Sequence, residues 1–313
     1  MNEGDVMDVS VLDDLCKQCS NWGKWGADDE LGTLNYITPE KVVSTGRLVK
    51  KGKVFGLALA YDANGPQRGL RGRFNPIRLM ISSGADPGSS YSDDVVTMPT
   101  QCGTQWDSLA HVFYHGKMYN DRPQSLVTSQ GASKNSIDKM KDSVVSRGVL
   151  LDIARYKGVD WLEEGYAITS EDLDGAAAQQ GAQVGRGDIL LVRTGHMTLC
   201  RSRGSWGTYA GGDAPGLSLL TAPWLYRKEI ASLVTDTWGV EVRPNEVPET
   251  PTLRQPFHRV AITYMGLLLG EIFYLDDLAI DCAADGVWEF LFAGPPLPFT
   301  GGVGSPCNPV AVK

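Results

Sequence analysis

Six polar residues in this 313-residue chain have types and spacings that could support chemistry. They are Gln101, Gln105, Asp107, His111, His258 and Glu271. Imidazole and carboxylate groups are common ligands for zinc and manganese, and a carboxamide oxygen is a weaker, hard ligand. Histidine also accepts protons near neutral pH, and the chain has only 4 histidines. The residues therefore allow metal-assisted acid/base catalysis, although a polar loop with mutually satisfied hydrogen bonds would have the same composition.

The first four of these residues occupy one short segment, 101–111, with Gly103 and Thr104 forming a turn inside it. Such a turn can point several side chains at one centre without regular secondary structure. His258 and Glu271 are distant in the sequence, and a single histidine at a helix start is often only a cap or a core residue. The interpretation as a site requires the fold to bring these segments together.

Other side chains are candidates for binding a substrate. Trp22, Trp25 and Trp106 offer flat apolar walls, and His115 could line the mouth of a pocket. Trp22 and Trp25 could equally fill a core. The arginines of the glycine-rich segment 64–75 could meet an anionic substrate, but a solvated surface is the interpretation that we favour for Arg68, Arg71 and Arg73.

The elements that must position these residues follow from local patterns. We expect helices at 1–20 (with an arm), from Pro39 after a Thr38 N-cap, at 170–180 with Ser170 as its cap, at 221–230, 257–265 and 276–284. We expect strands at 54–61, 77–81, 149–153, 188–192, 231–234, 267–272 and 287–292. Strands and helices alternate in the second half, which indicates an α/β or mixed sheet covered by helices. No change in composition marks a boundary, so residues 1–313 are predicted to form one domain with an N-terminal arm at about 1–35.

The bulk composition excludes some classes of function. The net charge of −8 argues against sequence-independent nucleic-acid binding. The apolar stretches are too short to cross a bilayer, and no secretory signal is recognisable, so we expect a cytoplasmic protein without a membrane partner. Cys16 and Cys19 form a single Cys-x-x-Cys motif without the second pair that a zinc ribbon needs, which disfavours a zinc or redox role.

The segment Gln101-Cys-Gly-Thr-Gln-Trp-Asp-Ser-Leu-Ala-His111 resembles the hallmark His-x-Gly-Thr-His-x-Asp-x-Pro-x-His of the cyclase family. This family includes bacterial kynurenine formamidase and isatin hydrolase. Further stretches similar to the family occur in the same order along most of the chain, at 25–35, 188–195, 216–218, 236–238, 275–278 and 304–306. The resemblance implies a swivelling β/α/β fold with a mixed sheet and packed helices, and a homodimer or homotetramer.

By position, the resemblance implies roles for the candidate residues. Gln101, Gln105 and Asp107 would flank a first metal site, whereas Asp107, His258 and Glu271 would form a second. His111 would be the catalytic base, working with Asp107. The implied activity is a hydrolase that uses metal-activated water on a formamide, cyclic amide or lactone bond of a small, aromatic or cyclic substrate.

Two glutamines stand where the family motif has histidines. Because imidazole is a far better zinc ligand than a neutral amide oxygen, the first site should be weakened. We expect one divalent ion, manganese or zinc, on Asp107, His258 and Glu271; magnesium and a metal-free site, in which Gln105 orients the substrate, remain open. Two other functions also remain open: a cyclase or dehydratase of the aromatic polyketide type, and a non-catalytic binding protein.

Overall fold

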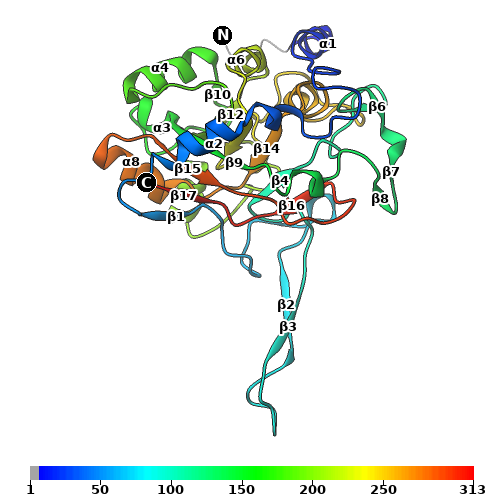
Figure 1. Cartoon of the computed structure of the whole chain (residues 1–313), viewed down its shortest axis with the longest axis vertical. Helices are drawn as coiled ribbons and strands as arrows, with labels where there is room; N and C mark the ends of the chain where they lie inside the picture. The colour runs from blue at the N-terminus through cyan, green and yellow to red at the C-terminus, as the bar shows by residue number, and fades with distance from the viewer. Residues whose placement is uncertain (1–6) are drawn as a thin grey trace.

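A nine-stranded mixed sheet runs through the protein, whose computed structural model describes residues 7–313 (Figure 1). Across the sheet the strands are β1 (Val54–Gly56), β17 (Val310–Val312), β15 (Glu289–Ala293), β9 (Val145–Asp152), β11 (Ile189–Arg193), β13 (Ser232–Thr235), β14 (Leu268–Glu271), β4 (Gln105–Asp107) and β16 (Gly304–Pro306). The central strands β9, β11, β13 and β14 are parallel, and their neighbours on both sides are antiparallel. Buried, nearly continuous apolar runs such as Ile189–Val192 are typical of parallel strands covered on both faces.

Helices surround this sheet and join its strands. They are α1 (Val9–Gln18), α2 (Pro39–Gly46), α3 (Ile153–Tyr156), α4 (Ser170–Gln180), α5 (His196–Ser202), α6 (Ala222–Lys228), α7 (Pro256–His258) and α8 (Asp276–Asp285). Helices α2 and α4 pack on β9, and α1 packs on the π-helix Arg259–Met265 (η6). The protein therefore has the predicted α/β architecture of a mixed sheet with packed helices. None of the helices within residues 7–313 combines the length and the apolar character that crossing a bilayer requires.

Several local predictions are confirmed, and three need correction. Thr38 caps α2 and Pro39 opens it, as expected. Helix α4 is capped by Thr169 and not by Ser170, because Thr169 and Asp172 form a reciprocal capping box. The strand predicted at 54–61 ends at Gly56, since the next backbone groups bond to Pro309 and to the Thr104 hydroxyl. The helix predicted at 257–265 is one short turn followed by the wider π-helix.

The N-terminal segment packs against the body along its described length. Residues 1–6 of the predicted arm lie outside the described residues. On α1, Leu12, Leu15 and Cys16 are buried, and Leu34 is buried further along. All 6 cysteines are buried and unbridged. Burial raises the pKa of the Cys16 thiol, which suits a core position and not a redox pair.

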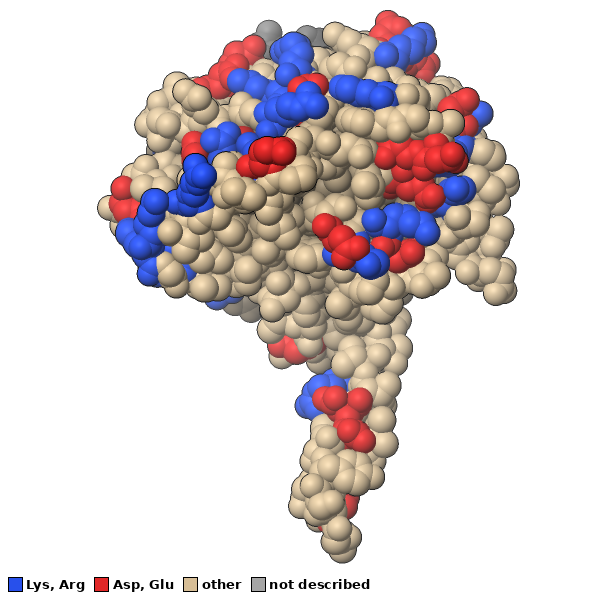
Figure 2. Space-filling model, in the orientation of Figure 1, with Lys and Arg blue, Asp and Glu red and all other residues tan. Residues whose placement is uncertain are grey.

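The hairpin formed by β2 (Ile77–Ser82) and β3 (Asp93–Thr97) extends far from the body (Figures 1 and 2). Its strands expose large apolar side chains, with Leu79 61% and Ile81 70% accessible. Charged side chains are sparse along it in Figure 2. Three further two-stranded sheets lie nearer the body: β5 (Lys117–Met118) with β6 (Arg122–Pro123), β7 (Val127–Thr128) with β8 (Gly131–Ala132), and β10 (Ala167–Ile168) with β12 (Gly216–Leu217).

Candidate active site and metal centre

Strand β4 presents alternate side chains to two environments, because successive residues of a strand point to opposite faces. Gln105 and Asp107 share one face, and Trp106 lies on the other. The strand pairs with β14 so that Gln105 stands opposite Glu271. The pairing thus joins the motif segment to Glu271, which is 166 residues away in sequence.

His258 reaches the same place from the end of α7. Its side chain is only 1% exposed, and its Nδ1 lies 2.5 Å from Oε1 of Glu241. Glu241 also accepts the backbone N–H groups of Phe257 and His258. Because the Nδ1–H group donates to Glu241, the ring is held with Nε2 facing the carboxylates of Asp107 and Glu271. A carboxylate behind a histidine is the usual arrangement in metal sites.

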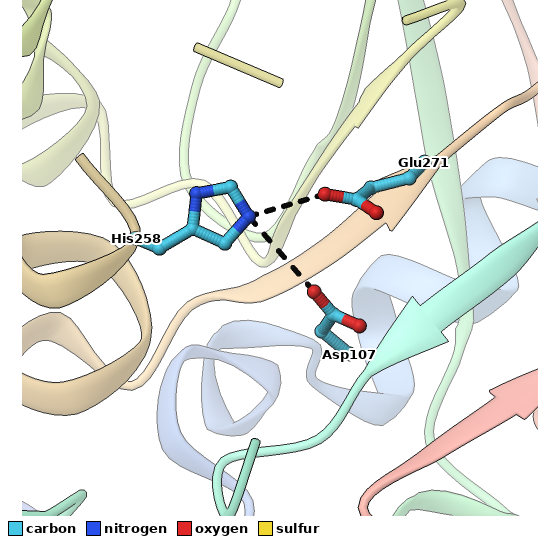
Figure 3. A group of neighbouring side chains, drawn as sticks. All are labelled: Asp107, His258 and Glu271. Atoms are coloured by element: carbon cyan, nitrogen blue, oxygen red, sulfur yellow. Dashed lines mark hydrogen bonds and ion pairs between the residues drawn. The ribbon is translucent and has the colours of Figure 1, made fainter. Parts of the chain in front are cut away.

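Asp107, His258 and Glu271 converge in the buried centre shown in Figure 3. Nε2 of His258 lies 3.1 Å from Oε1 of Glu271 and 3.9 Å from Oδ2 of Asp107. One ligand atom from each residue lies within 4.8 Å of the others. Among the described residues, Oδ1 of Asp107 and Oε1 of Gln105 have no hydrogen-bond partner although both are buried. Two carboxylates, one imidazole and unpaired oxygens fit a divalent cation.

The electrostatics of the centre indicate a site that needs a cation. Burial raises the pKa of Asp107, and the neighbouring Glu271 raises it further, against the influence of His111. Burial would lower the pKa of His258, but its hydrogen bonds with Glu241 and Glu271 outweigh this and raise the pKa to about 10. A divalent cation held by these residues would balance the charge of the same carboxylates.

Gln105 and Gln101 differ in what they contact. The amide of Gln105 donates to Oε2 of Glu271 at 2.6 Å, so Gln105 orients a carboxylate of the centre. The amide nitrogen of Gln101 lies 3.5 Å from Nδ1 of His111, and its oxygen accepts from Thr100. The structure therefore brings Gln105 to Glu271 and places Gln101 beside His111.

His111 lies between the buried centre and solvent. Its Nε2 is 3.7 Å from Oδ1 of Asp107, and its side chain is 19% exposed. Burial lowers the pKa of His111, while the charge of Asp107 opposes that shift. The imidazole is therefore neutral at physiological pH and can accept a proton.

A cavity of about 490 Å³ opens in front of His111. Its lining includes Val112, Phe113 and four arginines, Arg71, Arg73, Arg254 and Arg259. A neighbouring cavity of about 620 Å³ shares Phe113 and Arg259 and is lined by His115. His115 itself is exposed and lies 3.0 Å from Asp13. His115 therefore lines the neighbouring cavity and not the cavity at His111.

The predicted role of Trp106 in the pocket is wrong. Its indole is completely buried, donates to the carbonyl of Gly294, and packs edge-on against Phe273 and Phe292. The alternation of β4 directs it away from Asp107, into the core. Gly270 makes room for the ring, because a Cβ there would approach it to 2.7 Å.

The other two tryptophans predicted to bind substrate, Trp22 and Trp25, are half-buried near the N-terminus. Trp22 stacks on Tyr264 at 4.5 Å and donates to the carbonyl of Thr263. Trp25 meets the ring of Tyr36 edge-on at 5.1 Å. Neither tryptophan is among the residues that line the two cavities beside His111. Of the aromatic residues proposed from the sequence, the structure brings none to the cavity at His111.

Some residues of the site were not identified from the sequence. Glu241 is an isolated acid between two valines, and a charged residue inside an apolar run was the available signal. Arg71 and Arg73 were expected on a solvated surface; Arg71 is exposed and Arg73 half-buried, and both also line the cavity at His111. Nothing in the local sequence indicates that Arg254 and Arg259 join them.

The chain matches one family model and is similar to several solved structures. Residues 35–242 match the family model named Cyclase, described as "Putative cyclase". His258 and Glu271 lie beyond that match. A solved structure described as a novel cyclase is 39% identical, with a TM-score of 0.84, and the alignment covers 94% of this chain and 100% of that one. None of the curated proteins matches the chain.

More distant structures share the fold. Isatin hydrolase A from Labrenzia aggregata, bound to benzyl benzoate, is 18% identical with a TM-score of 0.63, over 87% of this chain and 97% of that one. Isatin hydrolase A from Ralstonia solanacearum is 19% identical with a TM-score of 0.63, over 88% and 98% of the two chains.

Proposed function

Because the chain belongs to the cyclase family, we propose that it is a metal-dependent hydrolase that opens a formamide, cyclic amide or lactone bond. The observation that carries the proposal is the buried convergence of Asp107, His258 and Glu271 next to His111 at the base of a cavity. A binding protein without catalysis would have no need to bury two carboxylates and an imidazole together, since each buried charge costs several kcal/mol.

Asp107, His258 and Glu271 would hold one divalent ion, manganese or zinc. When bound, such an ion supplies Lewis acidity, lowering the pKa of water and polarising a carbonyl oxygen. Gln105 fixes the orientation of the Glu271 carboxylate, and Glu241 fixes the tautomer of His258. These hydrogen bonds keep the three ligand atoms in place before a substrate arrives.

His111 is the proposed general base. Its neutral imidazole accepts the proton of the attacking water and returns it to the nitrogen or oxygen that leaves. Asp107 stands 3.7 Å from Nε2 and stabilises the imidazolium that forms between the two transfers. Val112 and Phe113 offer an apolar wall to a small cyclic or aromatic substrate. As the family resemblance implies, we propose a homodimer or homotetramer.

Ring closure or dehydration is the second candidate, because the 39%-identical structure is described as a cyclase. In that reaction His111 would remove a proton next to a carbonyl group, and the cation site would stabilise the enolate oxygen. The two reactions differ in whether water is a reactant. Incorporation of ¹⁸O from labelled water into the product distinguishes them.

The test combines metal analysis with activity. The protein is purified without added metal or chelator, its metal content is measured, and hydrolysis of isatin, formanilide, N-formylanthranilate and a δ-lactone is assayed. We expect about one manganese or zinc per chain, loss of hydrolysis after chelation, and recovery on adding back the ion. Absence of hydrolysis from the metal-loaded protein with every substrate of this panel would contradict the proposal.

A further inference from the structure

The arginines that line the cavity at His111 differ from other arginines of the protein in their ion pairing. In a separate cavity, Arg193 also lies in a polar wall, but it forms ion pairs with Asp152 and Asp276 at 3.0 and 2.9 Å. Those charges balance one another within the fold. The arginines of the His111 cavity have no carboxylate at ion-pair distance among the described residues, and only the more distant Asp107, Glu241 and Glu271 act on them.

Four guanidinium-bearing residues line the His111 cavity, and its lining contains neither aspartate nor glutamate. They are Arg71, Arg73, Arg254 and Arg259. Within residues 7–313, none of the four forms an ion pair with a carboxylate. Arg71 lies in the short 3₁₀ helix Leu70–Gly72 (η2) and Arg73 follows it, whereas Arg254 lies in a loop and Arg259 begins η6, so the fold assembles the cluster from two segments that are distant in sequence.

The cluster is held in position by uncharged contacts. The guanidinium groups of Arg71 and Arg73 lie 5.6 and 5.4 Å from the ring of Trp238, which is buried. Arg71 also donates to Oε1 of Gln255 at 2.9 Å. Both Arg71 and Gln255 have left-handed backbones, with φ of 55° and 54°. Residues other than glycine adopt this conformation at a cost, and such strain tends to mark functional loops.

The like charges act on one another. Arg71 is exposed as a whole residue, but partial burial of its guanidinium and the charges of Arg73, Arg254 and Arg243 lower its pKa, against the charge of Glu271. Arg243 is neutralised by Glu249 at 3.1 Å, whereas the four lining arginines are not neutralised in this way. An arrangement of crowded, unpaired arginines is stabilised when an anion enters.

We propose that this cavity binds a carboxylate carried by the substrate, so that the reacting bond is presented to His111 and the buried centre. The proposal rests on the proposed hydrolase function and narrows its substrates to anionic ones. Arginine matches a planar carboxylate with two parallel N–H groups, which fixes orientation as well as distance. Val112 and Phe113 would then contact the uncharged part of an aromatic carboxylate.

The first measurement is binding, and it does not depend on catalysis. Isothermal titration calorimetry compares benzoate with benzamide on the full-length protein. We expect benzoate to bind at least about tenfold more tightly, with an affinity that falls as sodium chloride rises. The double substitution R71Q/R73Q should remove the preference, and so should R254Q, a second variant in an exposed loop. R78Q on the β2–β3 hairpin is the matched control and should keep it. Circular dichroism confirms that each variant is folded.

The second measurement uses two formamides that differ by one carboxylate, N-formylanthranilate and formanilide. The R71Q/R73Q protein should show a KM raised at least about tenfold for N-formylanthranilate and unchanged for formanilide. Equal effects on both substrates, or equal binding of benzoate and benzamide by the unaltered protein, would overturn the carboxylate assignment while leaving hydrolysis intact. A benzoate preference in a protein that hydrolyses neither formamide would support the assignment and refute the hydrolase.

Discussion

The buried centre and the β2–β3 hairpin reverse the usual distribution of side chains in opposite ways. The centre buries a histidine and two carboxylates, all with 3% exposure or less. The hairpin exposes aliphatic side chains such as Leu79 and Ile81. Each reversal has a free-energy cost: several kcal/mol for a buried ion, and about 25 cal/mol per Å² of apolar surface left in water.

The two regions differ in how much of the fold supports them. In the centre, Glu241 and Gln105 hold the charged groups through hydrogen bonds that join distant segments. In the hairpin, the two strands mainly contact one another, and an isolated two-stranded hairpin is marginally stable. Buried charged side chains that many contacts hold in place indicate a catalytic site. Exposed aliphatic side chains on a projecting hairpin indicate a surface without a catalytic role. Substitutions at the buried centre should therefore change activity, and changes in the hairpin should not.

The largest effect is expected at His111. Replacing it by glutamine removes the proton acceptor and leaves the ligand set of Asp107, His258 and Glu271 in place. We expect kcat to fall by about 10²- to 10⁴-fold with metal content unchanged. Steady-state kinetics and elemental analysis measure the two quantities, and D94N on the hairpin is the control. Activity of H111Q within twofold of the unaltered protein would rule out His111 as the base.

Glu241 should have the next largest effect. In E241Q the amide cannot match a carboxylate that accepts from both Nδ1 of His258 and two backbone N–H groups. Metal affinity should fall by about 10- to 100-fold, as is typical for partners behind a ligand. A chelator competition titration measures this change. If E241Q binds metal as tightly as D94N does, Glu241 is not what orients His258.

His196 is a buried histidine whose Nε2 lies 4.0 Å from the exposed carboxylate of Glu164, farther than the 3.1 Å that separates His258 from Glu271. Burial lowers its pKa to about 4, with a contribution from Arg203, whereas the pKa of His258 is raised. From about pH 6.5, the ordinary value, down to about 4, the unfolded chain therefore binds more protons than the folded one. His196 thus contributes full stability above pH 6.5 and loses it as the pH falls.

The variant H196F should flatten this dependence, by at most about 1.4 kcal/mol per pH unit. Its ring can keep the stacking on Tyr209, which lies 5.1 Å away. Urea unfolding at pH 7.5, 6 and 5 provides the measurement. An equally steep loss of stability in H196F would assign the acid sensitivity to other groups.

The smallest effect is expected for the hairpin. Replacing residues 79–95 by an Asn-Gly turn should alter the free energy of unfolding of the body by no more than about 0.5 kcal/mol and leave kcat unchanged. Differential scanning calorimetry measures the change, and sedimentation velocity shows whether a homodimer or homotetramer depends on the hairpin. A fall in Tm of more than about 4 °C would show that the hairpin supports the fold.

Residue types and local patterns predicted part of the site and most of the fold. Asp107, His258 and Glu271 were singled out by residue type, the family resemblance grouped them into one site, and the long apolar and capped segments located most strands and helices. Trp106 was misassigned because its residue type does not reveal the face on which it lies, which depends on the register of β4 with β14. Glu241, Arg254 and Arg259 were missed because their roles arise from contacts between distant segments, and no local pattern reports those contacts; Arg71 and Arg73 were considered for an anionic substrate, but a solvated surface was favoured.

The register of β4 also constrains how the gene can change. Deleting one residue just before β4 would shift Trp106 toward the centre and carry a carboxylate into the aromatic core. Such a deletion should unfold the protein before it could alter the reaction. Selection for folding therefore also preserves the register that keeps Gln105 and Asp107 on the active-site face of β4. At the tip of the hairpin, between β2 and β3, the same deletion would displace nothing in the core. Variation in length among relatives should therefore accumulate at the tip and be absent next to β4.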